Sequence, residues 1–387
     1  MEYKLGEIAS VKGGKRLPKG VNLITTPNTH PYIRVRDLNN RRTLELTNDY
    51  EYVDDETQKS IERYIVDRGN IILSIVGTIG LVAIVGETLH KANLTENCVK
   101  IVPTDDVDRD FLYYYLKSPV GQASIARGTV GAVQAKLPIK NIQDIAIWLP
   151  EIIEQKRIAS VLACIDEKIE KNERINDNLL QQAQALFADA FPYAPDDELP
   201  IGWRKGTVGD IVDIHDSKRI PLSGAQRDKM TKRTYPYYGA ASLMDYVDDY
   251  IFDGTYLLLG EDGTVVDDAG YPILQYVWGQ FWVNNHAHIL TGKNGFSVES
   301  LMLLFKRTPV KSIVTGAVQP KISQANLRSI PVVIPAADAL TAFNALITPM
   351  FDQIRQNTDQ NKTLAQLRDA LLPKLMSGEI DVAAVQD

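Results

Sequence analysis

Residues 151–190 read EIIEQKRIASVLACIDEKIEKNERINDNLLQQAQALFADA, and this stretch contains neither glycine nor proline. Apolar residues and two asparagines recur in it at alternating steps of four and three, which is the heptad spacing of a coiled-coil seam. The pattern predicts one long helix, about 60 Å at a rise of about 1.5 Å per residue. Because an isolated helix depends on burial of its apolar face, this helix needs a partner.

A second copy of the seam lies near the C-terminus. An offset of 185 residues relates Gly131-Ala132-Val133-Gln134-Ala135-Lys136 to Gly316-Ala317-Val318-Gln319-Pro320-Lys321 and continues through both seams. An offset of 203 relates Lys15-Arg16-Leu17-Pro18 to Lys218-Arg219-Ile220-Pro221, so the interior of the second half is shorter by 18 residues. The chain is therefore a duplicated sequence whose halves share their ends and differ in their interiors. Shared ends indicate a common architecture, and different interiors indicate different specificities.

The most economical partner for each seam is the other copy. Two copies related by a pseudo-two-fold axis pair antiparallel, which would bring Asn172 to Asn361 and Asn176 to Asn357. A polar pair within an apolar seam costs stability and fixes the register. The alternative is that these asparagines face water at a bend.

The predicted pairing set takes the apolar and asparagine positions of both seams. Its members are Ile158, Leu162, Ile165, Ile169, Asn172, Asn176, Leu179, Leu186, Ile347, Met350, Ile354, Asn357, Asn361, Leu364 and Leu371. Arg368 interrupts the second seam at the place that Ala183 takes in the first. We therefore expect that turn to be frayed or to face solvent.

Short strand patterns and turns fill the rest of the chain. Apolar runs at 71–76 and 256–259 precede glycine-rich turns, and each half has one expected internal helix, at 109–118 and 298–307. We predict an α+β protein with two mixed α/β domains separated by two long helices, paired as an antiparallel coiled coil in a pseudo-two-fold repeat. The predicted division is 1–150 for the first domain, 151–195 for the first helix and linker, 196–335 for the second domain, and 336–387 for the second helix and tail.

Composition sets broad limits on the function. The 387 residues are 44% hydrophobic and 24% charged, as in ordinary globular proteins. The sequence has neither a long apolar run nor a signal-like start, so we expect no membrane span and a cytoplasmic location. The net charge of −7 argues against nucleic-acid binding, but residues 1–42 hold nine basic and three acidic side chains, and residues 200–233 hold eight and four. These clusters are either cationic binding surfaces or solvated loops.

Sequence motifs for common catalytic chemistry are absent. The chain has no phosphate-binding Gly-x-x-x-x-Gly-Lys-Ser/Thr loop, no Gly-x-Gly-x-x-Gly fingerprint, no Gly-x-Ser-x-Gly elbow and no Asn/Asp-Pro-Pro-aromatic tetrad. His286 and His288 could share a strand face, but the residues around them do not complete a metal-ligand set. We therefore expect a binding and spacing protein with no catalytic residue, metal or cofactor of its own.

Several stretches of the chain match one known family. They are Leu149-Pro150-Glu151, the following Glu154-Gln155-Lys156-Arg157-Ile158-Ala159, the stretches Tyr235-Pro236-Tyr237-Tyr238-Gly239-Ala240 and Gly260-Glu261-Asp262-Gly263, and the ending Leu372-Pro373-Lys374-Leu375-Met376-Ser377-Gly378-Glu379-Ile380. Together with the duplication, they resemble the specificity subunit of type I restriction–modification systems over essentially the whole chain. One departure is that the second helix begins Ala336-Ala337-Asp338-Ala339-Leu340 in place of the Glu-Gln-Lys-Arg start. The two helices therefore need not bind partner subunits equally.

The resemblance implies a division of labour between subunits. Each domain would be a target recognition domain that reads one half of a bipartite, asymmetric site in double-stranded DNA. The helices would set the gap between the half-sites and dock two methyltransferase subunits, which bring S-adenosylmethionine and methylate adenine. Motor–nuclease subunits, where present, would bring ATP and Mg for cleavage. This chain itself would be a non-catalytic subunit that binds no cofactor and no membrane.

The candidate DNA contacts follow from the repeat. Residues shared by both halves suit phosphate, which is the same in every sequence; they are Lys15, Arg16, Lys218 and Arg219. Unmatched basic residues suit base edges; they are Arg34, Arg36, Arg41, Arg42, Arg227, Lys232 and Arg233. Four residues of the repeated hexapeptides either contact DNA or fix the junction of domain and helix; they are Gln134, Lys136, Gln319 and Lys321.

Two other classes of function remain as alternatives. A self-sufficient DNA-modifying enzyme is disfavoured by the missing cofactor motifs. A scaffold that organises other proteins without DNA is disfavoured, more weakly, by the duplicated basic starts of the two halves.

Overall fold

The computed structural model describes residues 1–38, 41–131, 133–316, 318–380 and 382, so Ala132 and Ala317 of the repeated hexapeptides lie outside the described residues. The described chain forms two compact units. Unit 1 contains residues 1–171 and the described residues from 360 onward, and unit 2 contains residues 172–359. Both long helices divide between the units: α6 spans Ile152–Ala190 and α11 spans Ala337–Met376. This grouping follows packing, whereas the division predicted along the chain stays a prediction.

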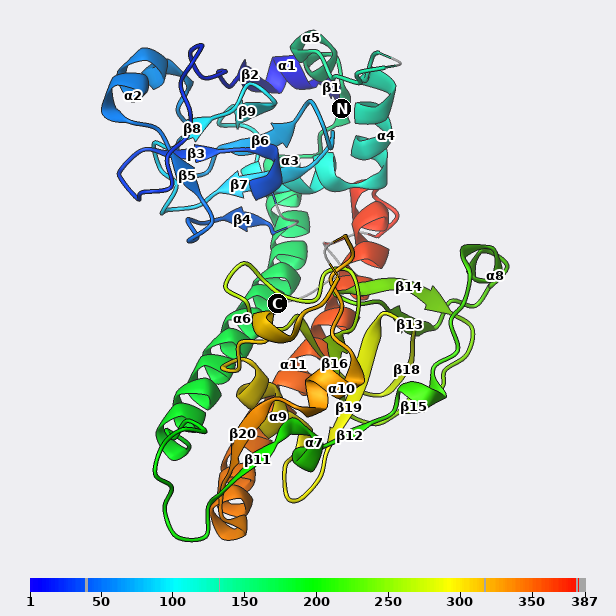
Figure 1. Cartoon of the computed structure of the whole chain (residues 1–387). Coiled ribbons are helices and arrows are strands. Elements are labelled where there is room, and N and C mark those ends of the chain that lie inside the picture. The colour runs from blue at the N-terminus through cyan, green and yellow to red at the C-terminus, as the bar shows by residue number, and fades with distance from the viewer. Residues whose placement is uncertain (39–40, 132, 317, 381, 383–387) are drawn as a thin grey trace. The chain divides into compact units, whose positions relative to one another are not determined.

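Unit 1 is built on three small sheets (Figure 1). The largest has the order β2 (Ala9–Gly13), β9 (Cys98–Pro103), β6 (Ile71–Ser74), β7 (Val82–Val85) and β4 (Thr43–Leu44). The second has the order β5 (Glu51–Tyr52), β3 (Pro31–Ile33) and β8 (Asn93–Leu94), and β1 (Glu2–Lys4) pairs with β10 (Ala146–Trp148). All four residues of β6 and of β7 are buried, which explains why every position except Ser74 is apolar.

The helices of unit 1 cover this framework. They are α1 (Leu5–Ile8), α2 (Asp55–Ile61), α3 (Arg109–Lys117), α4 (Pro119–Gly128) and α5 (Ile139–Gln143). The side chain of Asp108 caps α3 by accepting a hydrogen bond from Phe111 N, and the side chain of Ser118 caps α4 in the same way. Proline at the first position of α4 forces the break between the two helices. The internal helix predicted at 109–118 is thus confirmed.

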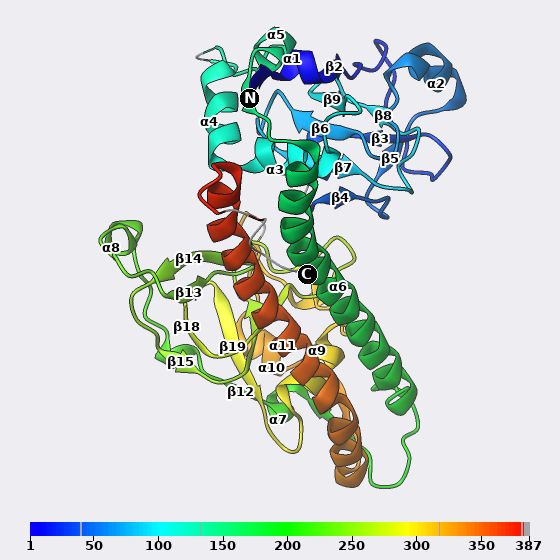
Figure 2. The ribbon, with the colours of Figure 1, turned by 180° about the vertical axis from the view of Figure 1, so that it is seen from behind.

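The long helices pair antiparallel within unit 1. The first turns of α6 lie beside the last turns of α11 (Figure 2), and Ile158 and Leu162 share one apolar core with Leu372 and Leu375. The same core continues into the sheet and into α3. The two helix ends therefore belong to the hydrophobic core of unit 1.

Arg368 does not behave as the sequence suggested. Its side chain is only 18% exposed, and its guanidinium lies 2.7 Å from Oδ1 of Asp166 on α6. The hydroxyl of Tyr114 donates to the other oxygen of Asp166 at 2.7 Å. The expectation of a frayed or solvent-facing turn is therefore wrong, because a buried carboxylate on the facing helix compensates the cation, and α11 continues to Met376.

Unit 2 repeats the architecture of unit 1. Its sheets have the orders β12 (Val212–Ile214), β19 (Ala287–Gly292), β16 (Tyr256–Gly260), β17 (Leu274–Val277) and β14 (Leu243–Val247), β13 (Tyr235–Tyr238), β18 (Gln280–Val283), β15 (Phe252–Asp253). A further pair joins β11 (Arg204–Thr207) to β20 (Pro331–Ile334). Its helices are α7 (Val208–Ile211), α8 (Gly224–Asp228), α9 (Val298–Phe305) and α10 (Gln324–Arg328), so the internal helix predicted at 298–307 is also confirmed.

The two interiors share their strand order although their sequences differ. The order β2-β9-β6-β7 in unit 1 corresponds to β12-β19-β16-β17 in unit 2. The parallel pair β3–β8 corresponds to the parallel pair β13–β18. A clear difference follows the internal helix: unit 1 has the ten-residue α4, whereas unit 2 has only the 3-10 turn η4 (Lys311–Ile313). Part of the shorter second interior is explained by this replacement.

The antiparallel pairing recurs in unit 2. Phe187 near the end of α6 packs with Phe343 and Ile347 near the start of α11. Nδ2 of Asn357 donates to Oδ1 of Asn176 at 2.8 Å, and Nδ2 of Asn176 donates to Oγ1 of Thr358 at 3.2 Å. The predicted approach of Asn176 to Asn357 is confirmed.

The burial of the predicted seam residues agrees with a role in helix pairing. Each of the fifteen pairing residues is buried or half-buried. The pairing of Asn172 with Asn361 stays a prediction. A search of the described residues finds no helix that is long and apolar enough to span a membrane.

Candidate nucleic-acid interface

In unit 1, the repeated basic pair Lys15-Arg16 follows β2, and a backbone hydrogen bond fixes its position. The backbone N–H of Lys15 donates to Leu94 O at 2.8 Å. The Lys15 side chain is exposed, and its ammonium lies 5.4 Å from the centre of the Tyr64 ring. Arg16 is 80% exposed and bonds Glu96 at 2.6 Å, a hydrogen bond that raises the pKa of Arg16. Both side chains thus present positive charge to solvent from a fixed position.

In unit 2, the same pair divides its roles. Lys218 is exposed at the end of the 3-10 turn η3 (Asp216–Lys218). Arg219 is only 13% exposed, and its Nη1 donates to Oε2 of Glu261 at 2.5 Å and to Ala287 O at 2.8 Å. Equivalent positions of the repeat therefore hold one solvent-facing arginine and one buried arginine.

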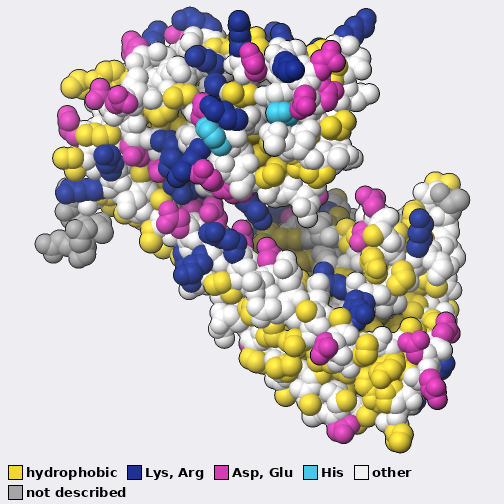
Figure 3. Space-filling model, turned by 90° about the vertical axis from the view of Figure 1, so that its left-hand side faces the viewer, with side chains coloured by type: hydrophobic (Ala, Val, Ile, Leu, Met, Phe, Trp, Pro, Cys, Tyr) yellow, Lys and Arg dark blue, Asp and Glu magenta, His cyan; other side chains and the backbone are white. Residues whose placement is uncertain are grey.

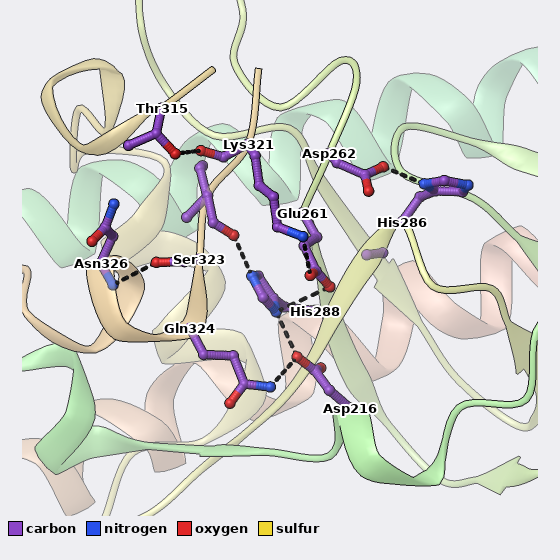
Figure 4. A network of polar contacts seen from close by, with 12 residues as sticks. Asp216, Glu261, Asp262, His286, His288, Thr315, Lys321, Ser323, Gln324 and Asn326 are labelled. Carbon is purple, nitrogen blue, oxygen red and sulfur yellow. Dashed lines mark hydrogen bonds and ion pairs between the residues drawn. The ribbon is translucent and has the colours of Figure 1, made fainter. Parts of the chain in front are cut away.

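A polar network lies at the end of β16 and the start of β19 (Figure 4). Arg219 joins it through Asp216 and Glu261. His288 is fully buried, with Nδ1 2.6 Å from Oδ2 of Asp216 and Nε2 2.8 Å from Ile322 O. Gln324 donates to the same Asp216 oxygen at 2.6 Å. Lys321 of the repeated hexapeptide lies 3.2 Å from Oε1 of Glu261. The network therefore connects the repeated basic pair of unit 2 to its hexapeptide, because Glu261 contacts both Arg219 and Lys321.

Three members of this network have the chemistry of metal ligands. Ligand atoms of Asp216, Glu261 and His288 lie within 4.8 Å of one another. However, both ring nitrogens of His288 already lie within hydrogen-bond distance of an oxygen, Asp216 Oδ2 for Nδ1 and Ile322 O for Nε2. Arg219 and Lys321 already compensate the carboxylates. The arrangement fits an internal ion-pair network and does not fit a metal centre.

The unmatched arginines of unit 1 lie around the 3-10 turn η1 (Val35–Asp37). Arg34 forms an ion pair with Glu51 and is largely shielded from solvent. Arg36 lies 3.1 Å from the same carboxylate but remains 57% exposed. Glu51 therefore fixes both guanidinium groups, and only that of Arg36 has a large free surface.

Arg41 and Arg42 differ in the same way. The Arg42 side chain is nearly buried, 2.9 Å from Oδ1 of Asp110 at the start of α3. Arg41 is exposed at the first described position after residues 39–40. Arg42 therefore anchors this loop to α3, and Arg41 is open to a ligand.

The unmatched basic residues of unit 2 cluster in α8 and in the loop that follows it. Arg227 is held by Asp245 at 3.0 Å and lies over the ring of Tyr237. Arg233, at 3.4 Å from the same carboxylate, is half-exposed, and Lys232 is exposed. Backbone N–H groups of residues 231–233 donate to Asp248 and lower the pKa of that carboxyl. These hydrogen bonds therefore fix the backbone of the loop that carries Lys232 and Arg233.

The two hexapeptides form loops that are closed by the same contacts. In unit 1, Val130 and Lys136 exchange two backbone hydrogen bonds of 2.9 Å. In unit 2, Thr315 and Lys321 exchange bonds of 2.8 and 2.7 Å. The side chains of Gln134, Lys136, Gln319 and Lys321 are exposed.

The predicted cations thus fall into two groups. The side chains of one group face solvent, although four of them also form ion pairs; they are Lys15, Arg16, Arg36, Arg41, Lys136, Lys218, Lys232, Arg233 and Lys321. Those of the other group are largely shielded from solvent in ion pairs; they are Arg34, Arg42, Arg219 and Arg227. On the face seen in Figure 3, Lys and Arg side chains of each unit stand among Asp and Glu side chains. The sequence did not predict the carboxylates whose ion pairs shield some arginines from solvent, although one of them, Glu261, lies in the family-like stretch Gly260–Gly263.

Comparison with known proteins places the chain in a family. The sequence profile of the type I restriction modification DNA specificity domain matches residues 1–181 and, a second time, residues 200–367. The chain belongs to the family of type I restriction–modification DNA specificity subunits. DNA sequence specificity is the function of this family, and the two matched domains correspond to the two halves of the repeat.

Individual specificity subunits are similar over part or most of their length. The MjaIX specificity subunit of Methanocaldococcus jannaschii is 25% identical, with 98% of this chain and 93% of that protein covered. A putative type I specificity subunit of Haemophilus influenzae is 30% identical over 134 residues, which is 35% of this chain and 34% of that one. The solved S subunit of M. genitalium shares the fold, with a TM-score of 0.59 at 18% identity, covering 97% of this chain and 95% of that chain.

Proposed function

We propose that this specificity subunit reads a bipartite, asymmetric site in double-stranded DNA, one half-site with each unit. The observation that carries the proposal is the pair of units with one strand order and different exposed cations. A shared framework suits the phosphate backbone, which is common to both half-sites. Different side chains on that framework suit two different base sequences.

The exposed cations are the proposed DNA contacts. Lys15, Arg16 and Lys218 contact phosphates from repeat-equivalent positions. Arg36, Arg41, Lys232 and Arg233 reach base edges from loops that the repeat does not match. The partly buried pairs Arg34–Glu51, Arg42–Asp110, Arg219–Glu261 and Arg227–Asp245 hold these loops in shape. Such preorganisation lowers the entropy that binding would otherwise cost.

The long helices are the proposed spacer and docking surface. Two methyltransferase subunits dock along them and supply S-adenosylmethionine and adenine methylation, and motor–nuclease subunits supply ATP-dependent, Mg-dependent cleavage. In the Glu-Gln-Lys-Arg start of α6, Gln155 is buried and bonds Asp108 N at 2.8 Å and Pro150 O at 2.9 Å. Lys156 and Arg157 of the same start are exposed. The outward pair is therefore available to a partner subunit, while Gln155 fixes the helix to its domain.

Mapping of methylated adenines tests this proposal. The chain is co-expressed with the adjacent methyltransferase gene, and the host DNA is sequenced for modified adenine. We expect one asymmetric motif of two specific parts separated by a fixed gap. Methylation by the purified chain alone would instead identify a self-sufficient enzyme. Failure to retain any duplex DNA in a filter-binding assay would identify a scaffold.

A further inference from the structure

Two fully exposed valines stand at the tips of the hexapeptide loops. Val133 is 103% exposed and Val318 is 98% exposed, relative to a free side chain. Among the exposed large apolar side chains of the described residues, they form the only pair that the 185-residue offset relates. Isolated exposed apolar residues are ordinary on protein surfaces, but the same one at the same place in two divergent halves needs a common cause.

Both tips are held on rigid bases. Leu137 N donates to Ile75 O at 2.9 Å in unit 1, and Ile322 N donates to Glu261 O at 2.8 Å in unit 2. Leu137 and Ile322 are themselves buried, so each loop is anchored in a core one residue beyond its lysine. A valine that touches nothing contributes no burial to folding. The two valine side chains therefore point into solvent and do not stabilise the fold.

The glycine that begins each hexapeptide has a similar backbone conformation in both units. Gly131 has φ +99° and Gly316 has φ +88°, a region that side chains rarely adopt. A Cβ atom on Gly131 would lie 2.6 Å from Gln134 O, and one on Gly316 would lie 2.3 Å from Gln319 O. Glycine is therefore required at the first position of each hexapeptide.

The surroundings of the tips favour DNA over protein as the common partner. Residues 129–138 and 314–322 contain no acidic side chain, and each loop carries an exposed lysine. In unit 2, Glu261 bonds both Arg219 and Lys321, so the loop adjoins the basic pair. In unit 1, Ile75 forms backbone hydrogen bonds with Leu137, at the base of the loop, and with Asn97. Asn97 follows Glu96, which pairs with Arg16, so this loop also adjoins the basic pair.

We propose that Val133 and Val318 act as apolar wedges that each enter a base step of one half-site. This inference rests on the proposed reading of a bipartite site. The faces of stacked bases are apolar in every sequence, so two different half-sites can offer the same contact. Lys136 of the first loop neutralises a phosphate beside the opened step, whereas Lys321 of the second loop stays in its ion pair with Glu261. The wedges fix the position of each unit on its half-site without reading bases themselves.

Base-stacking fluorescence tests the wedges in the assembled complex. The full chain with its methyltransferase subunit is bound to its mapped site, with 2-aminopurine placed at successive positions through both half-sites. We expect fluorescence to rise at one step in each half-site. Val133→Ser removes the rise in one half-site only, Val318→Ser removes it in the other, and each weakens binding about tenfold. Ile201→Ser, at an equally exposed position (102%) outside the hexapeptide loops, changes neither the fluorescence rise nor the affinity.

Other outcomes overturn the inference in distinguishable ways. Site-specific binding with no fluorescence rise, or a rise that survives both valine substitutions, contradicts the wedges and leaves the proposed function standing. Loss of the methyltransferase subunit from the purified Val133→Ser or Val318→Ser complex would show that the tips contact protein. Absence of any site-specific binding by the unaltered complex would contradict the proposed function as well.

Discussion

At the scale of single residues, the environment decides the role of each cation more than its place in the repeat. Arg16 and Arg219 are repeat equivalents, yet Arg16 is exposed beside Glu96 and Arg219 is buried against Glu261. Exposed ion pairs contribute little to stability and leave the charge open to a ligand. Buried pairs are costly to break, because removal of one partner leaves an uncompensated charge.

This contrast predicts opposite effects of two equivalent substitutions. Arg16→Ala should weaken binding to every duplex and reduce the slope of log affinity against log salt by about one, with unchanged free energy of unfolding. Arg219→Ala should lower the free energy of unfolding by about 3 kcal/mol. Salt-dependent binding and denaturant unfolding of both variants provide the measurement. An unchanged salt slope for Arg16→Ala would remove Arg16 from the phosphate contacts.

The carboxyl of Asp216 gives a prediction of pH dependence. Burial opposes its ionisation, but the hydrogen bond and charge of His288, the Ile289 N–H and Arg219 outweigh burial and lower the pKa of Asp216 below its ordinary value of 3.8. A folded-state pKa below the unfolded value means that the ionised group stabilises the fold above about pH 4, and that this contribution disappears as the pH falls through the folded-state value.

Denaturant unfolding of Asp216→Asn as a function of pH tests this expectation. The variant should be less stable than the native chain at neutral pH, because an amide replaces an acceptor that meets several donors. The difference in unfolding free energy should shrink as the pH falls below about 4. A difference that stays constant from neutral to acid pH would show that the Asp216 charge does not contribute.

At the scale of elements, the long helices combine apolar packing with a few polar contacts within each unit. In unit 2, Asn357 donates to Asn176 inside an otherwise apolar contact between α6 and α11. In unit 1, Arg368, Asp166 and Tyr114 join α11, α6 and α3. Polar contacts of this kind specify one alignment at some cost in stability.

The asparagine pair allows a double-substitution test. Asn176→Leu alone should lower the unfolding free energy by about 1–3 kcal/mol, because it leaves Nδ2 of Asn357 without that acceptor. Asn176→Leu with Asn357→Leu should recover or exceed the original stability, because leucines fill the seam. Equilibrium unfolding of the two variants and the native chain gives the comparison. Additive losses in the double variant would argue against a register role for the pair.

At the scale of the whole molecule, the duplicated helices and the repeat were predictable because their signals are local or periodic. Heptad spacing marked α6 and α11, and proline after Ser118 marked the end of α3. The shared strand order of the two interiors was not predictable, because the interior sequences do not match. The sorting of arginines was not predictable either: Arg16 meets Glu96 from 80 residues away, and Arg219 meets Glu261 from 42 residues away.

The central claim is that two readers of different half-sites are spaced by the paired helices. It is tested most directly by deleting four residues from α6 and the four equivalent residues from α11, then mapping methylated adenines. Four helical residues span about 6 Å, or one to two base pairs at about 3.4 Å each. We predict the same two half-sites with the gap shortened by that amount. An unchanged gap in the methylated motif would contradict the account.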